Sequence, residues 1–311
     1  MSSVPRVPEA SEGSGGPVTA REAWAGSRAV GARALTRDVA SRFRYGDDFS
    51  HARALAFQLA LAALPLVIAA IGLAGQWDAP TIRLVLSRTV LQLTPGASDD
   101  LLRRTLPSED TDLATAALLL AGVSALVALT TAMAQVERGA NRIYGIQRDR
   151  PSVDKYRRAL ALSIAAGLPL MTGSLLLLTR GAFADAVESV YAVDDDVVGA
   201  WTGPVGLVLV VVSLMAMLRR APARRQPRWP VLLAGSLLTV GAWTGLTLLL
   251  AGFLELSTGF TPVYGPVTGV IALLLWAQLS ATALFFGVAV SAELEMAAHR
   301  ARFRPTADTD R

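Results

Sequence analysis

The sequence lacks the residues from which disulfides and many metal sites are built. Its 311 residues include no cysteine, two histidines and a single lysine, and only 17% of them are charged. Without cysteine, neither a disulfide framework nor a thiolate metal site can form. We therefore predict a chain with no metal and no cofactor.

Motifs for enzyme chemistry are also missing. His51 and His299 lie far apart in the sequence, each at the edge of an apolar stretch, whereas a metal-dependent nuclease needs clustered histidine and carboxylate ligands. No phosphate-binding glycine loop, nucleotide fingerprint or nucleophile motif is present. We expect no enzyme activity, and ribonuclease activity in particular is disfavoured.

Apolar residues are abundant instead. They make up 52% of the chain, and the mean hydropathy is +0.44, as in integral membrane proteins. The clearest stretch, 266–290, contains no charged side chain. At about 1.5 Å per residue, a helix of this length crosses the hydrocarbon core of a bilayer.

Six such stretches predict an all-α, polytopic protein with six transmembrane helices. The predicted spans lie at about 52–75, 113–134, 159–179, 200–218, 231–254 and 266–290. We expect them to form a single membrane domain over residues 20–304. Polar segments at 1–19 and 305–311 are predicted to be disordered tails.

The loop charges predict the orientation of these spans. With a cytoplasmic N-terminus, 24 of the 29 basic residues fall on the cytoplasmic side and 5 on the other. This asymmetry favours a bacterial cytoplasmic (inner) membrane protein with both termini in the cytoplasm. The sequence pI near 9.9 then reflects topology, and we predict no nucleic-acid partner.

Two segments outside the spans are also predicted to be helical. Over 20–45, Trp24, Leu35, Val39 and Phe43 recur near one face among several arginines. This pattern predicts an amphipathic helix in the headgroup region that meets anionic lipids; a solvated basic helix is the alternative. Between the first two spans, residues 76–111 carry turn and capping signals for a short helical segment outside the cytoplasm.

Within the spans the informative residues are prolines and amides. Pro65 and Pro169 are predicted helix kinks. Gln58 and Gln278 are candidate cavity-lining or interhelical polar residues, because a primary amide in hydrocarbon needs partners. We expect Gln278 to face the bundle interior, near one of the kinks.

Charge and glycine patterns complete the description of the spans. No carboxylate, lysine or histidine lies deep in any predicted span, so no intramembrane proton relay is indicated. The pairs Gly241/Gly245 and Gly265/Gly269 have the four-residue spacing that allows close helix packing.

Four motifs together resemble the YihY/BrkB family of bacterial inner-membrane proteins, once labelled ribonuclease BN. They are the first span with 54–57 and 63–66, the segment 139–144 (GANRIY), the last span with 264–265 and 270–276, and the closing 287–295. The second motif adds Asn141 and Tyr144 to the candidate polar residues. The chain departs from the family at Ala289 and Ser291, where the resemblance implies Glu and Asn.

What the resemblance implies is a six-helix inner-membrane protein, discussed as transporter-like or as acting in envelope biogenesis. Proline-interrupted spans and a polar residue near mid-membrane favour a transporter or lipid-translocating permease. The absence of deep intramembrane charge favours the alternative, a non-transporting scaffold or assembly factor. Membrane lipids, anionic at the basic cytoplasmic face, are the predicted partners, and the sequence indicates no oligomeric state.

Overall fold

The computed structural model describes residues 18–76, 111–178, 195–256 and 268–302. Every regular element in these ranges is helical. Most of the predicted N-terminal tail, the predicted C-terminal tail and the predicted short helical segment after the first span lie outside them. Val18 and Thr19, the last residues of the predicted tail, are described: Val18 is buried, and the Thr19 side chain caps the helix that begins at Ala20.

Six helical runs are long and apolar enough to cross a membrane, as predicted. Five are single helices: α3 (Asp48–Gln76), α6 (Thr111–Ile143), α10 (Asp195–Arg220), α11 (Trp229–Leu256) and α13 (Thr268–Arg302). The third run consists of α7 (Ser152–Leu162), the π-helical segment η1 (Ser163–Gly167) and α8 (Leu168–Leu178). The chain is thus an all-helical, multi-pass protein in its described part.

Several helices are longer than the apolar stretches that predicted them. Helix α6 continues past the predicted span at 113–134 to Ile143, as the sequence of 135–144 indicates, and α13 continues past residue 290 to Arg302. Both extensions carry charged side chains that lower the mean hydropathy. Three of these charges, Glu137, Glu293 and Glu295, are buried and paired with arginines, as described below.

The predicted N-terminal helix is two helices, α1 (Ala20–Val30) and α2 (Ala32–Tyr45), separated by Gly31 at φ 82°. Only glycine adopts this conformation readily. The break lets the two helices turn independently, so Val39 and Phe43 are buried while Trp24, predicted on the same face, is 63% exposed. Both helices pack against α13.

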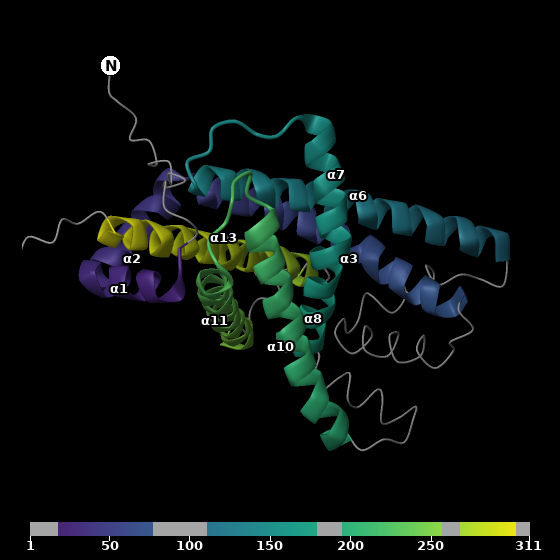
Figure 1. Cartoon of the computed structure of the whole chain (residues 1–311). Helices are drawn as coiled ribbons and strands as arrows, with labels where there is room; N and C mark the ends of the chain where they lie inside the picture. The colour runs from purple at the N-terminus through teal and green to yellow at the C-terminus, as the bar shows by residue number, and fades with distance from the viewer. Residues whose placement is uncertain (1–17, 77–110, 179–194, 257–267, 303–311) are drawn as a thin grey trace, which may run out of the picture.

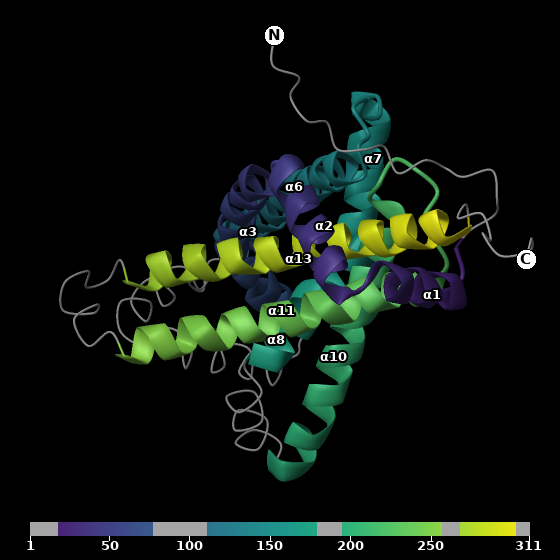
Figure 2. The ribbon, with the colours of Figure 1, turned by 90° about the vertical axis from the view of Figure 1, so that its left-hand side faces the viewer.

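Three antiparallel helix pairs make up the membrane domain: α3 with α6, α8 with α10, and α11 with α13. Figures 1 and 2 show that these pairs run in different directions from a common region near α2 and the C-terminal half of α13. Apolar side chains on the flanks of the pairs, such as Leu120 on α6 and Leu249 on α11, are exposed. Lipid tails would cover such surfaces in a membrane.

Glycines allow the closest helix contacts, but not the glycines we predicted. A Cβ atom on Gly287 of α13 would collide with Thr239 and lie 2.8 Å from the Gly235 carbonyl oxygen of α11. At Gly241, Gly245 and Gly269, by contrast, a Cβ would meet nothing within 4 Å. The prediction of close helix packing at Gly241, Gly245 and Gly269 was therefore wrong. Gly265 lies outside the described residues.

The third run is irregular just before Pro169, the second residue of α8. The N–H of Leu168 donates to the carbonyl of Ser163, which closes a π-helical turn. The Ser163 hydroxyl donates to the Ala159 carbonyl (2.7 Å) and lies 3.0 Å from the Leu129 carbonyl oxygen on α6. The structure thus places an irregular turn directly before α8 and Pro169. Helix α3 includes Pro65, and the kink expected there stays a prediction.

Candidate functional site at the common helix ends

Buried charged and polar side chains gather where the helix pairs meet. We call this group the polar hub and define it by Arg42, Glu137, Asn141, Tyr144, Arg150, Arg224, Glu293 and Glu295. Its members come from α2, from the C-terminal ends of α6 and α13, and from the two loops that connect α6 to α7 and α10 to α11. Every helix pair therefore has one end at the polar hub.

The first ion pair joins α2 to α13. Arg42 Nε lies 2.5 Å from Glu293 Oε1, and the two side chains are 3% and 4% exposed. Arg42 Nη1 also donates to the carbonyl of Ile143, the last residue of α6, at 2.8 Å. One guanidinium group thus holds three helices together.

The second ion pair joins the loop after α10 to α13. Arg224 donates from both terminal nitrogens to the two carboxylate oxygens of Glu295, at 2.8 and 3.0 Å. Its guanidinium carbon lies 4.8 Å from the ring centre of Tyr144. Burial raises the pKa of Tyr144, and its hydroxyl has no hydrogen-bond partner in the structure.

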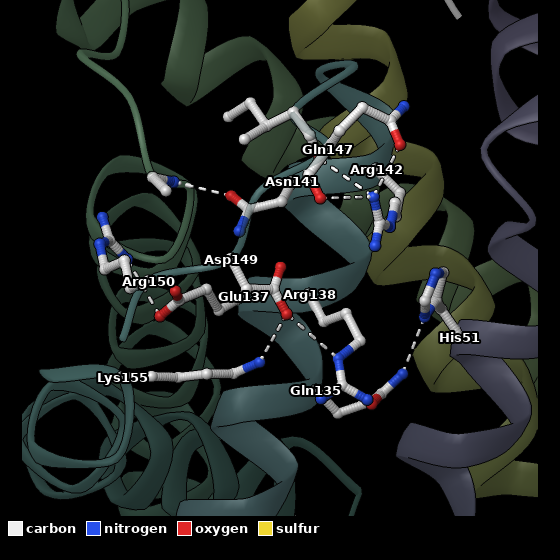
Figure 3. Close-up of polar contacts among 12 residues, drawn as sticks. His51, Gln135, Glu137, Arg138, Asn141, Arg142, Gln147, Asp149, Arg150 and Lys155 are labelled. Atoms are coloured by element: carbon white, nitrogen blue, oxygen red, sulfur yellow. Dashed lines mark hydrogen bonds and ion pairs between the residues drawn. The ribbon is translucent and has the colours of Figure 1, made fainter. Parts of the chain in front are cut away.

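The third set of contacts ties the two loops to each other (Figure 3). Arg150 pairs with Glu137 at 3.0 Å and donates to the carbonyls of Ala221 and Pro222 at 3.0 and 2.9 Å. The Asn141 side-chain oxygen accepts from the N–H of Ala223 at 2.8 Å. Both loops are therefore fixed to the end of α6.

A smaller ionic cluster lies at the edge of the polar hub. Asp149 lies 3.0 Å from the amino group of Lys155 and 3.5 Å from Arg138. Burial alone would raise the pKa of Asp149. The hydrogen bond from Lys155 and the charges of Lys155 and Arg138 outweigh burial, so the pKa of Asp149 lies below its usual range. The nearby Asn141 amide also lowers the pKa of Asp149, although the two side chains form no hydrogen bond.

The two histidines lie on different helices. His51 Nδ1 is 2.9 Å from the side-chain nitrogen of Gln135 (Figure 3), and His299 Nε2 is 4.0 Å from Glu295. Among the residues that the structure describes, no group of three or more His, Cys, Asp or Glu side chains is placed to hold a metal ion.

The structure separates the four polar residues that we singled out from the sequence. Asn141 and Tyr144 belong to the polar hub, whereas Gln58 and Gln278 do not. Gln278 is half-buried and donates to Thr282 of its own helix at 3.4 Å, so the interhelical hydrogen bond we considered is not found among the described residues. The side-chain oxygen of Gln58 is buried without a hydrogen-bond partner.

Sequence reasoning missed the charged members of the polar hub. Glu137, Glu293 and Glu295 lie beyond the ends of the predicted spans, where a charge usually means exposure to water. A signal was present for two of them, because Glu293 and Glu295 are flanked on both sides by alanine, leucine or methionine, while Glu137 follows a valine and precedes an arginine. An acidic residue in such a setting, on a helix with arginine-rich neighbours, indicates a buried pair.

The comparison with known families decides the identity of the chain. The profile of the family described as "Virulence factor BrkB" matches residues 39–311. The chain belongs to the BrkB family. This match confirms the resemblance to the YihY/BrkB family. It agrees with the six helical runs that identify the chain as a multi-pass membrane protein.

A relative of this BrkB family chain is "UPF0761 membrane protein azo3165" of Azoarcus sp. (strain BH72), 28% identical over 297 residues. The match covers 86% of this chain and 66% of that protein, so the chain spans just under two thirds of the relative's length. No solved structure matches the chain.

Two of the motifs that resemble the BrkB family supply members of the polar hub. The segment 139–144 provides Asn141 and Tyr144, and the closing segment provides Glu293 and Glu295. Ser291, where the resemblance implies Asn, is fully buried and donates to the Gly287 carbonyl at 3.0 Å. Its small side chain fits the tight crossing of α11 and α13, because a Cβ on Gly235 would collide with it.

Proposed function

We propose that the chain is a transporter-like permease that moves a lipid or an amphipathic solute across the bacterial inner membrane, without enzyme activity. The observation that carries this proposal is the polar hub, which joins three diverging helix pairs at one end through buried ionisable groups. These groups lie at helix ends and in loops, beyond the apolar stretches, but burying them away from water is costly, and such a cost is often kept for a functional reason.

The arrangement of the helix pairs supports a moving part. Arg42–Glu293 and Arg224–Glu295 cross between separate elements, so breaking them would loosen the connections of α13 to α2 and to the loop after α10. Transporters commonly alternate between states by rocking such units against one another. The π-helical interruption before Pro169 adds a second feature that is frequent at functional sites.

Lipid is the favoured substrate because the chain presents both apolar flanks and a basic surface. Exposed arginines on α1 and α2 are Arg21, Arg28, Arg33, Arg37 and Arg44. We propose that this surface meets anionic lipid headgroups of the cytoplasmic leaflet. The same basic asymmetry supports a cytoplasmic position for the polar hub and for both termini, and no nucleic-acid partner is proposed.

Reconstituted vesicles can test the proposal. Purified protein would be placed in vesicles with a fluorescent phospholipid, and a membrane-impermeant reductant would be added outside. We expect the protein to make inner-leaflet lipid accessible to the reductant, and Glu293→Gln to slow this strongly. Asp38→Asn, which alters an exposed ion pair with Arg300 at 2.9 Å, is the matched control and should leave the rate unchanged.

The outcome that contradicts the proposal is the absence of lipid or solute movement in vesicles that contain correctly folded protein. A scaffold or assembly factor is the second candidate, because Glu137, Glu293 and Glu295 lie near helix ends and are each paired with an arginine. Complementation of a deletion strain separates the two. A scaffold would rescue the strain without any measurable movement of lipid or solute.

A further inference from the structure

Asp48, the first residue of α3, is buried without any of the contacts that normally stabilise a carboxylate. The residue is 0% exposed, and neither carboxyl oxygen has a hydrogen-bond partner among the residues that the structure describes. An ionised carboxylate in such surroundings is strongly unfavourable, because the charge loses its hydration and gains no hydrogen bond in return. The usual remedies are a cationic partner, helix capping, a metal ion or a proton.

The cation that acts on Asp48 is already engaged elsewhere. Arg42 is the basic residue close to Asp48, but its Nε binds Glu293 and its Nη1 binds the Ile143 carbonyl. One guanidinium group therefore lies between two buried carboxyl groups. The pair Arg42–Glu293 is electrically neutral by itself, so an ionised Asp48 would leave the buried group with a net negative charge.

The other charged groups nearby do not compensate Asp48. Asp47, in the turn before α3, is acidic and exposed. On α13, Arg300 lies 3.9 Å from the second oxygen of Glu293 and pairs with Asp38. One turn along α3, His51 contacts Gln135 of α6.

Helix capping and metal binding do not account for Asp48 either. Its oxygens accept no backbone N–H, so it does not cap α3. Asp48 also belongs to no group of potential metal ligands among the residues described. A Cβ built on Gly46 would lie 2.8 Å from Asp48 Oδ1 and 3.0 Å from the Arg42 carbonyl oxygen. The carboxyl group therefore lies beside the turn between α2 and α3. Of the usual remedies, a proton remains.

We infer that Asp48 is a proton-binding site, whose carboxyl group carries a proton at neutral pH while Arg42 is paired with Glu293. When Arg42 leaves Glu293, its guanidinium becomes available to Asp48, and the proton passes to water at the same end of the helices. In combination with the transport function proposed above, on which this last step rests, the proton becomes the coupling ion. Protonation of Asp48 itself does not depend on transport.

Infrared spectroscopy of the purified full-length chain in detergent tests this site directly. At pH 7 the wild type should show a protonated-carboxyl C=O band that moves to lower frequency in heavy water and is missing in Asp48→Asn. Asp38→Asn, a carboxyl on the neighbouring helix α2 that is paired with Arg300, is the control and should retain the band. The asparagine is neutral and nearly isosteric, so Asp48→Asn should fold like the wild type.

A second variant keeps the test decisive if Asp48→Asn is poorly folded. Asp48→Glu should retain a protonated-carboxyl band at a displaced frequency, because the longer side chain alters its surroundings. The proposal is overturned if the band at pH 7 is unchanged in both Asp48 variants. Because the experiment needs no vesicles and no substrate, its failure is distinguishable from failure of the proposed transport function.

Discussion

The Arg42–Glu293 pair shows what burial does to the energetics of an ion pair. Both side chains are almost completely removed from water, whereas Arg300 and Asp38 form a pair between the same two helices at the surface. Exposed pairs contribute about 0–1 kcal/mol, because water solvates the separated ions well. Removing one partner of a buried pair typically costs about 3–5 kcal/mol, because the remaining charge is left without water or a counter-ion.

We therefore expect Arg42→Met to lower the free energy of unfolding by about 3 kcal/mol or more, and Asp38→Asn to lower it by less than about 1 kcal/mol. The double variant Arg42→Met, Glu293→Met should recover much of the loss, since it leaves no unpaired charge. Denaturant unfolding in detergent micelles measures all three. Equal losses for Arg42→Met and Asp38→Asn would show that the buried pair has no special role.

The packing of helix pairs depends on which glycine lies at the crossing point. Gly287 and Gly235 let the backbones of α11 and α13 approach closely, and Thr239 and Ser291 fill the adjacent space. Gly241 of α11 has the same residue type and lies in the same helix, but it is exposed and has no neighbour that a methyl group would meet. The two positions form a matched pair for substitution by alanine.

Gly287→Ala should reduce stability by about 1–3 kcal/mol, because the added methyl group forces the helices apart. Gly241→Ala should be neutral or stabilising by up to about 1 kcal/mol, because alanine loses less backbone entropy in a helix. Thermal unfolding in micelles would compare the two variants. A destabilised Gly241→Ala protein would instead reveal a contact at that position, such as one with a second copy of the chain.

For the whole molecule, the polar hub constrains the topology. It brings together the end of α2, the C-terminal end of α13 and the loops 144–151 and 221–228. These are the four regions that carry the excess of basic residues in the sequence. Because the four regions contact one another, they must lie on the same side of the membrane. An even number of spans must therefore separate any two of them.

Reporter fusions test this topology. Fusions after Gly145 and after Arg225 should give a cytoplasmic signal, because the basic loops stay on the cytoplasmic side. Fusions near Ser98 and near Asp195 should give an external signal. A cytoplasmic signal at Asp195 would contradict the six-span topology, while inversion of all four signals would retain the spans and reverse the orientation.

The sequence alone determined the class of this protein and the number of its spans. Crossing a bilayer depends on the length and hydropathy of each stretch by itself, so 266–290 could be recognised without knowledge of any other helix. The asymmetry of the loop charges is likewise a sum over single residues. The family could be recognised because motifs such as 139–144 are local in the sequence.

Only the tertiary structure decided which polar and small residues meet. Glu293 and Arg42 are 251 positions apart, and nothing in the neighbourhood of either residue indicates the other. Gly287 and Gly241 are likewise indistinguishable until the crossing of α11 and α13 is known. Hydropathy measures transfer from water to lipid, whereas Glu293 is transferred from water to a site containing a guanidinium group, and the free energy of that transfer depends on helices distant in the sequence.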